Sequence, residues 1–375
     1  MTQESQKKPV IAIVGLGLLG ASICETLRTR LFPVHIIGIS SPNSTKTALE
    51  QGLIDESLTY DEISLIKLRV DLVFLCTPIK HIFSMVEKLS ESKTPWKEGA
   101  IVTDVGSTKS EICQFAWDKL GEQVFIGGHP MAGSEKNGID ARDATLFESA
   151  LWLLTPSPKQ AFVLAESLLF QVINTLGSTI HLCDIDSHDE WLAAVSHLPQ
   201  LLSTQLSVST FKHFPQAISV AGPGYRDMSR LALSSYPMWQ SILETNADKI
   251  HYALNKYIDE LESLQTYLKT KNWNQVESSF ETAYHGRQNL NIPQEGWSNS
   301  LIDVIVTVKD QTGMISKIVV PLSDAKLDIR DIQLLKIREG MGGTLRLSFS
   351  SIQQAKQAVK LLETLSIQAK LRSEL

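Results

Sequence analysis

The chain has 375 residues, and at about 100–200 residues per domain it is expected to form two or three domains. Hydrophobic residues make up 43% and charged residues 20%, so the chain can bury sizeable cores and is not disordered throughout. Its net charge of −6 argues against binding to nucleic acid or to an anionic membrane surface. The polar N-terminus, 1–9, is too short for a secretory signal, and no apolar stretch is long enough to span a membrane. We therefore expect a cytoplasmic protein.

Short apolar runs alternate with helical stretches between residues 10 and 183. Such runs are typical of buried parallel strands that are covered by helices on both faces. We expect strands at 10–14, 34–39, 71–76, 100–105, 124–128, 151–154 and 179–183. A helix over 159–177 precedes the last of them. This pattern predicts an α/β domain of the Rossmann type over residues 1–184.

The pattern becomes helical after residue 184. The segment 187–190, Ser-His-Asp-Glu, has the sequence of a capping box, and His188 within it is expected to be exposed or structural. Farther along, apolar residues recur in steps of four and three, so they line one face of a long helix, inside the subunit or across a dimer. They are Ile250, Leu254, Tyr257, Leu261, Leu264 and Leu268. We expect an all-helical substrate and dimerisation domain over 185–288, followed by a linker over 289–300.

The last part of the chain, 301–375, changes character again. It predicts strands at 301–308, 326–338, 344–350 and 367–371, with helices at 312–325 and 353–365. The resulting order βαββαβ is that of a ferredoxin-like sandwich.

A glycine-rich segment between the first predicted strand and a helix over 21–30 fits a dinucleotide-binding loop. Its residues are Gly15, Leu16, Gly17, Leu18, Leu19 and Gly20. The first glycine permits a tight turn, the second lets the backbone approach a pyrophosphate, and the third lets helix and strand pack closely. The N-terminus of the helix adds N–H donors and partial positive charge.

The cofactor preference is indicated by the end of the second strand. NAD-binding domains usually carry an acidic residue there, but this chain has Ser40 and Ser41, with Lys46 nearby. Without a carboxylate to repel a 2′-phosphate, NADP is slightly favoured over NAD.

Three other strand ends carry polar residues. They contain Thr77 and Pro78, Ser107, and His129 between a Gly-Gly pair and a proline. Because ligands bind at the carboxyl edge of such a sheet, we expect Thr77 and Pro78 to contact the cofactor and His129 to be catalytic. No cluster of His, Cys, Asp or Glu has the spacing of metal ligands, so we expect no metal.

These segments together resemble the prephenate/arogenate dehydrogenase family. The matching stretches are GLGLLGASI, LVFLCTP, TDVGSTK, FIGGHPMAGSE, SHLPQLL and AGPGYRDMSRLALSSYPMWQSILETN, in family order over about residues 10–285. The C-terminal βαββαβ unit, with Asp310-Gln-Thr-Gly313 after its first strand, is similar to an ACT domain, a module that binds small amino acids.

The resemblance implies NAD(P)-dependent oxidative decarboxylation of prephenate to 4-hydroxyphenylpyruvate, in tyrosine biosynthesis. In this role, His129 accepts a hydrogen bond from the ring hydroxyl, and Ser107 orients that hydroxyl and the nicotinamide. Arg230 binds the ring carboxylate, with Asp227 as its expected ion partner; the role of Arg226 stays open. The remaining family positions are His197, near the side-chain carboxylate, and three that line or gate the pocket, Ser134, Glu135 and Trp239.

The resemblance also implies a homodimer through the helical domain and feedback control through the ACT domain, with tyrosine as the expected effector. Three alternatives stay open. Arogenate dehydrogenase uses a related substrate, and the motifs around the side-chain pocket do not separate the two enzymes. A non-catalytic sensor of dinucleotide and amino acid would not need His129, Ser107 and Arg230. A β-hydroxyacid dehydrogenase would carry a catalytic lysine in place of the GGHP segment.

Overall fold

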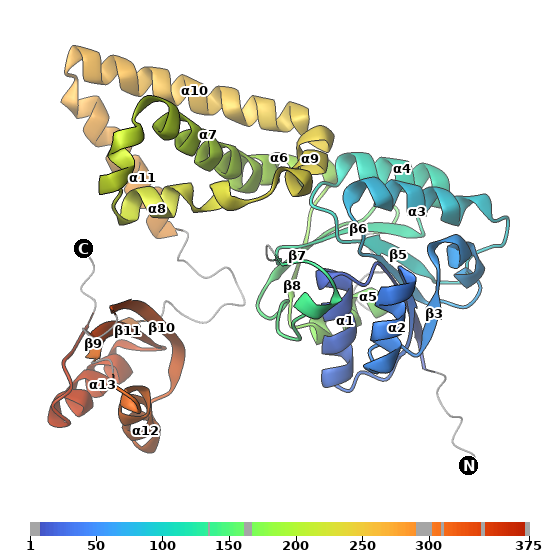
Figure 1. The fold of residues 1–375 in the computed structure, drawn as a ribbon, viewed down its shortest axis with the longest axis horizontal. Helices are drawn as coiled ribbons and strands as arrows, with labels where there is room; N and C mark the ends of the chain where they lie inside the picture. The colour runs from blue at the N-terminus through green and yellow to red at the C-terminus, as the bar shows by residue number, and fades with distance from the viewer. Residues whose placement is uncertain are drawn as a thin grey trace. The chain divides into compact units, whose positions relative to one another are not determined.

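A computed structural model of the chain describes residues 8–133, 136–160, 167–289, 302–308, 311–338 and 342–371. The chain divides into two compact units, which we call the first unit, Met1–Glu260, and the second unit, Leu261–Leu375 (Figure 1). The division falls inside a long helix. The domain boundaries at 184, 288 and 300 therefore stay a prediction.

The first unit is built around an eight-stranded sheet in the order β3-β2-β1-β4-β5-β6-β7-β8. The strands are β1 (Val10–Val14), β2 (His35–Ile39), β3 (Glu56–Leu58), β4 (Leu72–Leu75), β5 (Ile101–Asp104), β6 (Phe125–Pro130), β7 (Leu151–Thr155) and β8 (Thr179–Leu182). Strand β1 pairs in parallel with both β2 and β4, so the strand order reverses there. The loops at the carboxyl ends of these strands form the edge at which such sheets bind ligands.

Helices cover both faces of this sheet, as the alternating pattern predicts. Helices α1 (Leu18–Thr29), α2 (Pro42–Glu50) and α5 (Leu168–Thr175) pack on one face, and α3 (Ile79–Glu91) and α4 (Ser110–Leu120) on the other. Neighbouring residues of one strand enter different cores: Ile13 packs with the first set and Val14 with the second. Strands buried on both faces explain why the sequence shows continuous apolar runs.

The sheet departs from the prediction at β7, which pairs antiparallel with β6. The expectation of a parallel sheet throughout is wrong at this point. A parallel neighbour requires a crossover connection, usually a helix. In the described part of the connection from β6 to β7, the only helical element is the short 3-10 turn Ile139–Ala141. The short strand β3 is also unexpected, because Glu-Ser-Leu is not an apolar run.

Helices alone follow the sheet up to residue 289, as expected. They are α6 (Ile185–Leu192), α7 (Leu198–His213), α8 (Pro223–Ser229), α9 (Tyr236–Thr245), α10 (Ala247–Thr270) and α11 (Trp273–Asn289), with a π-helical turn, Ala193–His197, between α6 and α7. The predicted capping box is wrong. Asp184 caps α6 by accepting a hydrogen bond from the N–H of Ser187 at 2.8 Å.

The second unit contains the predicted ferredoxin-like sandwich. Its strands are β9 (Ile302–Val308), β10 (Ile329–Arg338), β11 (Gly342–Phe349) and β12 (Ala369–Leu371), and its helices are α12 (Met314–Asp324) and α13 (Ile352–Thr364). The sheet has the order β10-β11-β9-β12 with antiparallel pairs throughout. Val304 and Leu347 of the sheet pack against Leu322 of α12 and Leu362 of α13.

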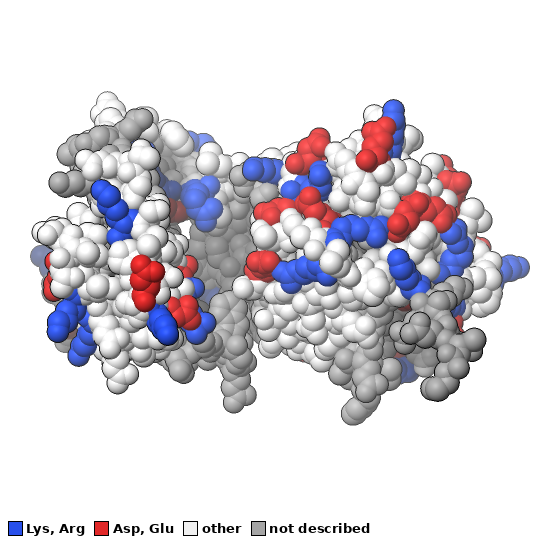
Figure 2. All heavy atoms as spheres, turned by 90° about the horizontal axis from the view of Figure 1, so that it is seen from below, with Lys and Arg blue, Asp and Glu red and all other residues white. Residues whose placement is uncertain are grey.

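Two further observations concern the described residues. No helix among them has both the length and the apolar character that crossing a bilayer requires. On the face shown in Figure 2, acidic and basic side chains are interspersed over the first unit rather than gathered into a region of one sign.

Candidate active site

The glycine loop between β1 and α1 has the geometry that a dinucleotide needs. Gly15 has φ +98°, and a Cβ there would lie 2.7 Å from the carbonyl oxygen of Cys76. A Cβ on Gly20 would lie 2.0 Å from the carbonyl oxygen of Gly15, so only glycine allows α1 to pack this closely. Gly17, by contrast, faces open space and caps α1 without a side chain. The first N–H groups of α1 are thus open to a pyrophosphate.

Ser40 lies at the end of β2, where the ribose of a dinucleotide binds in this type of fold. Its Oγ accepts a hydrogen bond from the N–H of Leu16 at 3.3 Å and lies 3.3 Å from the hydroxyl of Tyr60. Ser41 is exposed and caps α2 by accepting from the N–H of Ser44. The hydroxyl of Ser40 therefore faces the glycine loop and that of Ser41 the start of α2, and their binding to a cofactor stays a prediction.

The two neighbouring strand ends add polar groups to the same edge. The Oγ1 of Thr77, after β4, is buried and has no hydrogen-bond partner among the described residues. Pro78 caps α3, and Ser107, after β5, is half-buried. An orphaned hydroxyl beside Gly15, whose Cβ would lie 3.0 Å from the Thr77 methyl, fits a bound cofactor that supplies the missing partner.

His129 lies inside β6 rather than just after it, and only 8% of its surface is exposed. The two glycines before it are required by close packing. A Cβ on Gly127 would lie 2.2 Å from the Thr155 hydroxyl oxygen, and one on Gly128 would lie 2.5 Å from the carbonyl oxygen of Asp104. The Gly-Gly pair thus lets β6 pack closely against β5 and β7. This packing places His129 next to the carboxyl end of β5.

A buried ion pair fixes this part of β6. Lys109 and Asp104 form a salt bridge, and neither side chain has any exposed surface. Asp104 also accepts hydrogen bonds from the N–H of Gly106 at 2.8 Å and of Gly128 at 3.0 Å, while the Nζ of Lys109 donates to the carbonyl of Gly128 at 2.9 Å. Both peptide groups of Gly128 are therefore held by charged side chains, directly before His129.

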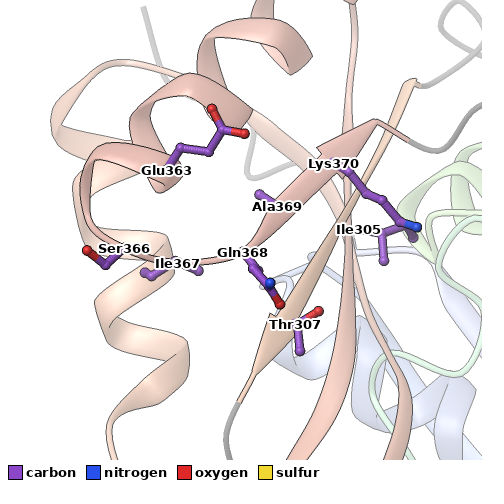
Figure 3. A pocket seen from close by; sticks show the side chains of 8 residues that line it. All are labelled: Ile305, Thr307, Glu363, Ser366, Ile367, Gln368, Ala369 and Lys370. Carbon is purple, nitrogen blue, oxygen red and sulfur yellow. The ribbon is translucent and has the colours of Figure 1, made fainter.

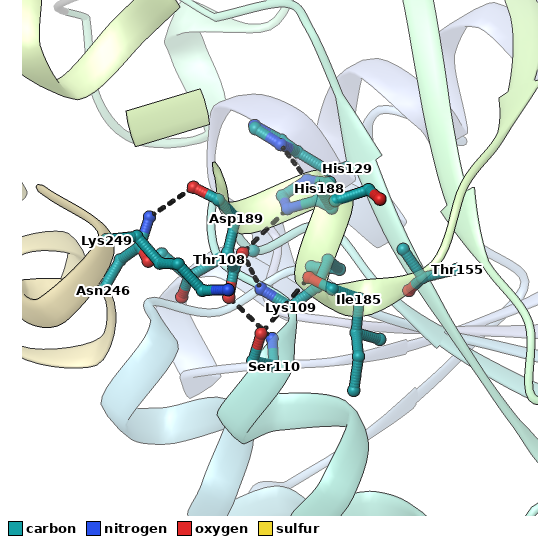
Figure 4. Close-up of polar contacts among 12 residues, drawn as sticks. Thr108, Lys109, Ser110, His129, Thr155, Ile185, His188, Asp189, Asn246 and Lys249 are labelled. Atoms are coloured by element: carbon teal, nitrogen blue, oxygen red, sulfur yellow. Dashed lines mark hydrogen bonds and ion pairs between the residues drawn. The ribbon is translucent and has the colours of Figure 1, made fainter. Parts of the chain in front are cut away.

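Behind His129 lies a second histidine, His188 of α6, which is completely buried. The two rings are joined by a 3.0 Å contact between Nδ1 of His129 and Nε2 of His188 (Figure 4). Nδ1 of His188 lies 2.8 Å from Oδ1 of Asp189. His188 was expected to be exposed or structural, and the expectation of exposure is wrong. The polar start of α6 is covered by β6 and by the start of α4.

His197 and Trp239 also come together, next to Asn246. His197 closes the π-helical turn, a feature often found at functional sites. Its ring meets that of Trp239 edge to face at 6.0 Å, and its Nδ1 lies 3.2 Å from Nδ2 of Asn246. The same amide of Asn246 donates to the carbonyl of Asp189 at 2.8 Å. Nε1 of Trp239 is buried without a partner among the described residues.

Burial keeps all three histidines neutral. Burial, followed by the charges of His188, Lys109 and His197, lowers the pKa of His129 well below 6.5. Burial also lowers the pKa of His188, although its hydrogen bond to Asp189 acts in the opposite direction. For His197, burial lowers the pKa to about 4. A neutral imidazole can accept a proton, which a general base requires.

Among the described residues, no hydrogen bond or ion pair joins Arg230 to this cluster. It begins the 3-10 turn Arg230–Leu233 after α8, and it is exposed. The expected ion pair with Asp227 is not formed in the described part of the chain; both residues are exposed, where water weakens such a pair. Ser134 and Glu135 lie outside the described residues.

Comparisons with known proteins identify the family. The model of the prephenate dehydrogenase nucleotide-binding domain matches residues 23–180, and that of the prephenate dehydrogenase dimerization domain matches residues 184–282. A prephenate dehydrogenase of Bacillus subtilis is 33% identical over 96% of this chain and 97% of its own length. The chain belongs to the prephenate dehydrogenase family.

Two solved structures of similar proteins support this assignment. One is a prephenate dehydrogenase from Aquifex aeolicus in complex with hydroxyphenyl propionate and NAD+, with a TM-score of 0.68 and 27% identity over 76% of this chain and all of that chain. The other is an arogenate dehydrogenase from Synechocystis, with a TM-score of 0.67 and 32% identity over 75% of this chain and 99% of that one.

Sequence analysis missed several residues of this prephenate dehydrogenase family site. They are Asp104, Lys109, Asp189 and Asn246, and the contact of His188 with His129. Asp104 and Lys109 belong to the TDVGSTK stretch. Two residues of opposite charge at the end of an apolar strand could have indicated a buried ion pair there. No local signal marks Asn246, because its partners are far away in the sequence.

The neutral histidines make stability depend on pH. In the unfolded chain each has an ordinary pKa near 6.5, so below that pH the unfolded state binds more protons than the folded state and stability falls. With a folded pKa of about 4, His197 alone should lower the free energy of unfolding by about 2 kcal/mol between pH 7 and pH 5. Urea denaturation of wild type and His197→Asn at both pH values measures this. An equal loss in the two proteins would contradict it.

Lys109→Met should destabilise the first unit strongly. The substitution leaves an unbranched apolar side chain one atom shorter, and the carboxylate of Asp104 stays buried without its cation. Breaking a buried pair by removing one partner costs about 3–5 kcal/mol. Thermal unfolding of this variant beside Lys119→Met, whose ion pair with Glu87 is partly exposed, measures the effect. Similar melting points for the two variants would contradict it.

Proposed function

We propose that this protein is a prephenate dehydrogenase that converts prephenate to 4-hydroxyphenylpyruvate by NAD(P)-dependent oxidative decarboxylation, in tyrosine biosynthesis. The observation that carries the proposal is the buried, neutral His129 at the sheet edge that also bears the glycine loop. Bound on that loop, the cofactor supplies the acceptor of a hydride.

His129 is the proton acceptor in this proposal. Neutral at physiological pH, it accepts a hydrogen bond from the ring hydroxyl of the substrate and takes up the proton as the hydride leaves the same carbon. The ring carboxylate then departs as CO2, and the electrons of the broken carbon–carbon bond move through the ring to the oxygen as the ring becomes aromatic. His129 returns the proton to that oxygen, which gives the phenol of the product. Ser107, half-buried at the next strand end, orients the hydroxyl.

In this proposal, residues of the helical domain bind the two carboxylates of the substrate. Arg230 is exposed and forms no ion pair in the described ranges, so its guanidinium is available to bind the ring carboxylate in a bidentate manner. His197 is neutral, and its Nδ1 accepts from Asn246, so its Nε2–H is left to donate to the side-chain carboxylate. Asp227 and Trp239 complete the pocket in this proposal, together with Ser134 and Glu135.

Arogenate is the second candidate substrate, because the similar Synechocystis protein is an arogenate dehydrogenase at 32% identity. An assay of the purified protein with prephenate or arogenate, each with NAD or NADP, separates the candidates by the absorbance of the reduced cofactor. Reduction with neither substrate would favour a non-catalytic sensor.

His129→Asn should lower kcat by about 10²–10⁴-fold and change KM little, because the contribution of a general base arises as the proton moves. The steady-state kinetics of the variant with prephenate measure both constants. Turnover close to that of the wild type would remove His129 from the role of base.

NADP is slightly favoured over NAD as the cofactor. Ser40 and Ser41 stand where NAD-specific proteins carry a carboxylate, and the hydroxyl of Ser40 already faces the glycine loop. Lys46 of α2 is exposed, with only a 3.9 Å contact to Glu50, so it can turn toward a 2′-phosphate.

Ser40→Asp should shift the preference toward NAD, since a carboxylate at this place binds the ribose 2′-hydroxyl and repels a 2′-phosphate. The ratio of kcat/KM for the two cofactors, measured for wild type and variant, gives the result. A wild type that already strongly prefers NAD would contradict our interpretation of this loop.

A homodimer through the helical domain is part of the proposal. Of the predicted apolar stripe on α10, only Ile250 is buried in the single chain, whereas Tyr257, Leu261 and Leu268 are 36–50% exposed. A second copy that covers this face would explain the repeat, and the matching family model is that of a dimerization domain.

Tyrosine is proposed as the effector of the second unit. A groove of about 950 Å³ lies beside the Gly313 loop, where φ is +84° and glycine is favoured. It adjoins a hollow of about 530 Å³ between α13, β9 and β12, in which Gln368 and Thr307 present polar groups (Figure 3). Polar groups in a partly apolar hollow suit an amino acid.

Removal of the ferredoxin-like sandwich tests this regulation. Full-length protein should be inhibited by millimolar or lower tyrosine, and a chain that ends at Glu295 should stay active but lose much of the response. Coupling between effector and substrate sites is typically 5- to 150-fold in affinity. Inhibition is compared at equal saturation with prephenate, because tyrosine also resembles the product. Identical inhibition curves would refute the regulatory role and leave the dehydrogenase proposal intact.

A further inference from the structure

His129 is the end of a buried chain of three side chains. From its Nδ1 the chain continues to Nε2 of His188 at 3.0 Å, and from Nδ1 of His188 to Oδ1 of Asp189 at 2.8 Å. His188 has no exposed surface and Asp189 has 1%. Neither residue has a role in the proposed mechanism so far, and both are shielded from bulk water.

Asp189 is held as an ionised acceptor. Its two oxygens accept from the N–H groups of Lys109 at 2.7 Å and Ser110 at 2.8 Å, at the start of α4, as Figure 4 shows. Burial alone would raise the pKa of Asp189, but the hydrogen bonds from His188, Ser110 and Lys109 outweigh it and lower the pKa below 3.8. Its backbone carbonyl is fixed in addition by Asn246. A carboxylate that accepts from backbone N–H groups on both oxygens has no proton to give.

The position of each proton in the chain follows. Because Asp189 only accepts, Nδ1 of His188 must carry a proton. His188 is neutral, so its Nε2 has none and accepts. The facing Nδ1 of His129 must then be the donor, which leaves Nε2 of His129 as the unprotonated nitrogen. An imidazole without such a partner could hold its proton on either nitrogen.

We propose that His188 and Asp189 are positioning residues that fix the tautomer and the ring orientation of His129, so that its Nε2 is the proton acceptor. The inference rests on the proposed function of His129. Once Nε2 has taken up the substrate proton, the new positive charge on His129 lies at the end of a chain that closes on the carboxylate of Asp189. The other charged or titratable groups around it are Lys109, at the start of α4, and His197, in the π-helical turn.

Two substitutions of His188 separate hydrogen bonding from packing. His188→Leu removes the acceptor that faces His129. We expect kcat to fall about 10- to 100-fold, which is a part of the ~10²–10⁴-fold that a general base contributes. KM should stay within about twofold of the wild-type value. In His188→Gln the carboxamide oxygen can accept from His129 while its N–H donates to Asp189, so kcat should return to within a few-fold of the wild type. His35→Leu is the matched control, because His35 begins β2, at the far end of that strand from the site, and is 40% exposed.

The ring nitrogens of His129 give a direct measurement. With ¹⁵N-labelled histidine, and with the signal assigned by comparison with His129→Asn, NMR should show Nδ1 protonated and Nε2 bare in the wild type. The same state is expected in His188→Gln, and a shift toward the other tautomer in His188→Leu.

Three results would overturn the inference. One is the observation that wild-type His129 carries its proton on Nε2; this measurement does not depend on the folding of any variant. Another is a His188→Leu variant that keeps both its kcat and the wild-type tautomer. The third is a His188→Gln variant that melts like the wild type but is as slow as His188→Leu. The NMR measurement of the wild-type tautomer does not depend on turnover, whereas the role of His129 as the base is tested by the kinetics of His129→Asn. The two measurements therefore distinguish a failure of the proposed function from a failure of this inference.

Discussion

The buried ion pair between Lys109 and Asp104 is the constraint on which the rest of the site depends. Two charges without exposed surface are tolerated only if almost every hydrogen-bonding group around them is satisfied. Here the partners are the N–H groups of Gly106 and Gly128 and the carbonyl of Gly128. The pair therefore fixes the turn after β5 and the backbone before His129 at the same time.

The same turn orders the second half of the site. Lys109 and Ser110 are the first residues of the α4 region, and their N–H groups need acceptors that the helix itself cannot provide. Asp189 supplies them from α6, about eighty residues farther along the chain. Thr108, next to them, contacts the hydroxyl of Thr245 at 2.7 Å. These hydrogen bonds join the sheet to the helical region next to the site, and the proposed base and the proposed carboxylate-binding Arg230 come from opposite sides of that junction.

Much of this architecture could be predicted from the sequence, because burial on both faces leaves continuous apolar runs. The bounds of β1 were predicted to the residue, and those of β4 and β5 to within one residue at each end. The direction of β7 could not be predicted, since it depends on the connection after β6 and not on the composition of the strand. His129 was found from its position at a strand end, which is a local property. Its partner His188 was misjudged because burial of a helix start depends on what packs over it.

The long helix α10 links the site to the second unit. Asn246, directly before it, donates to the carbonyl of Asp189, and the helix then continues past Glu260 into the second unit. An effector bound in the second unit can change catalysis only if it favours one arrangement of the chain over another. The start of α10 is tied to the site by the hydrogen bond of Asn246, because the residue whose carbonyl accepts it, Asp189, also has its carboxylate 2.8 Å from Nδ1 of His188.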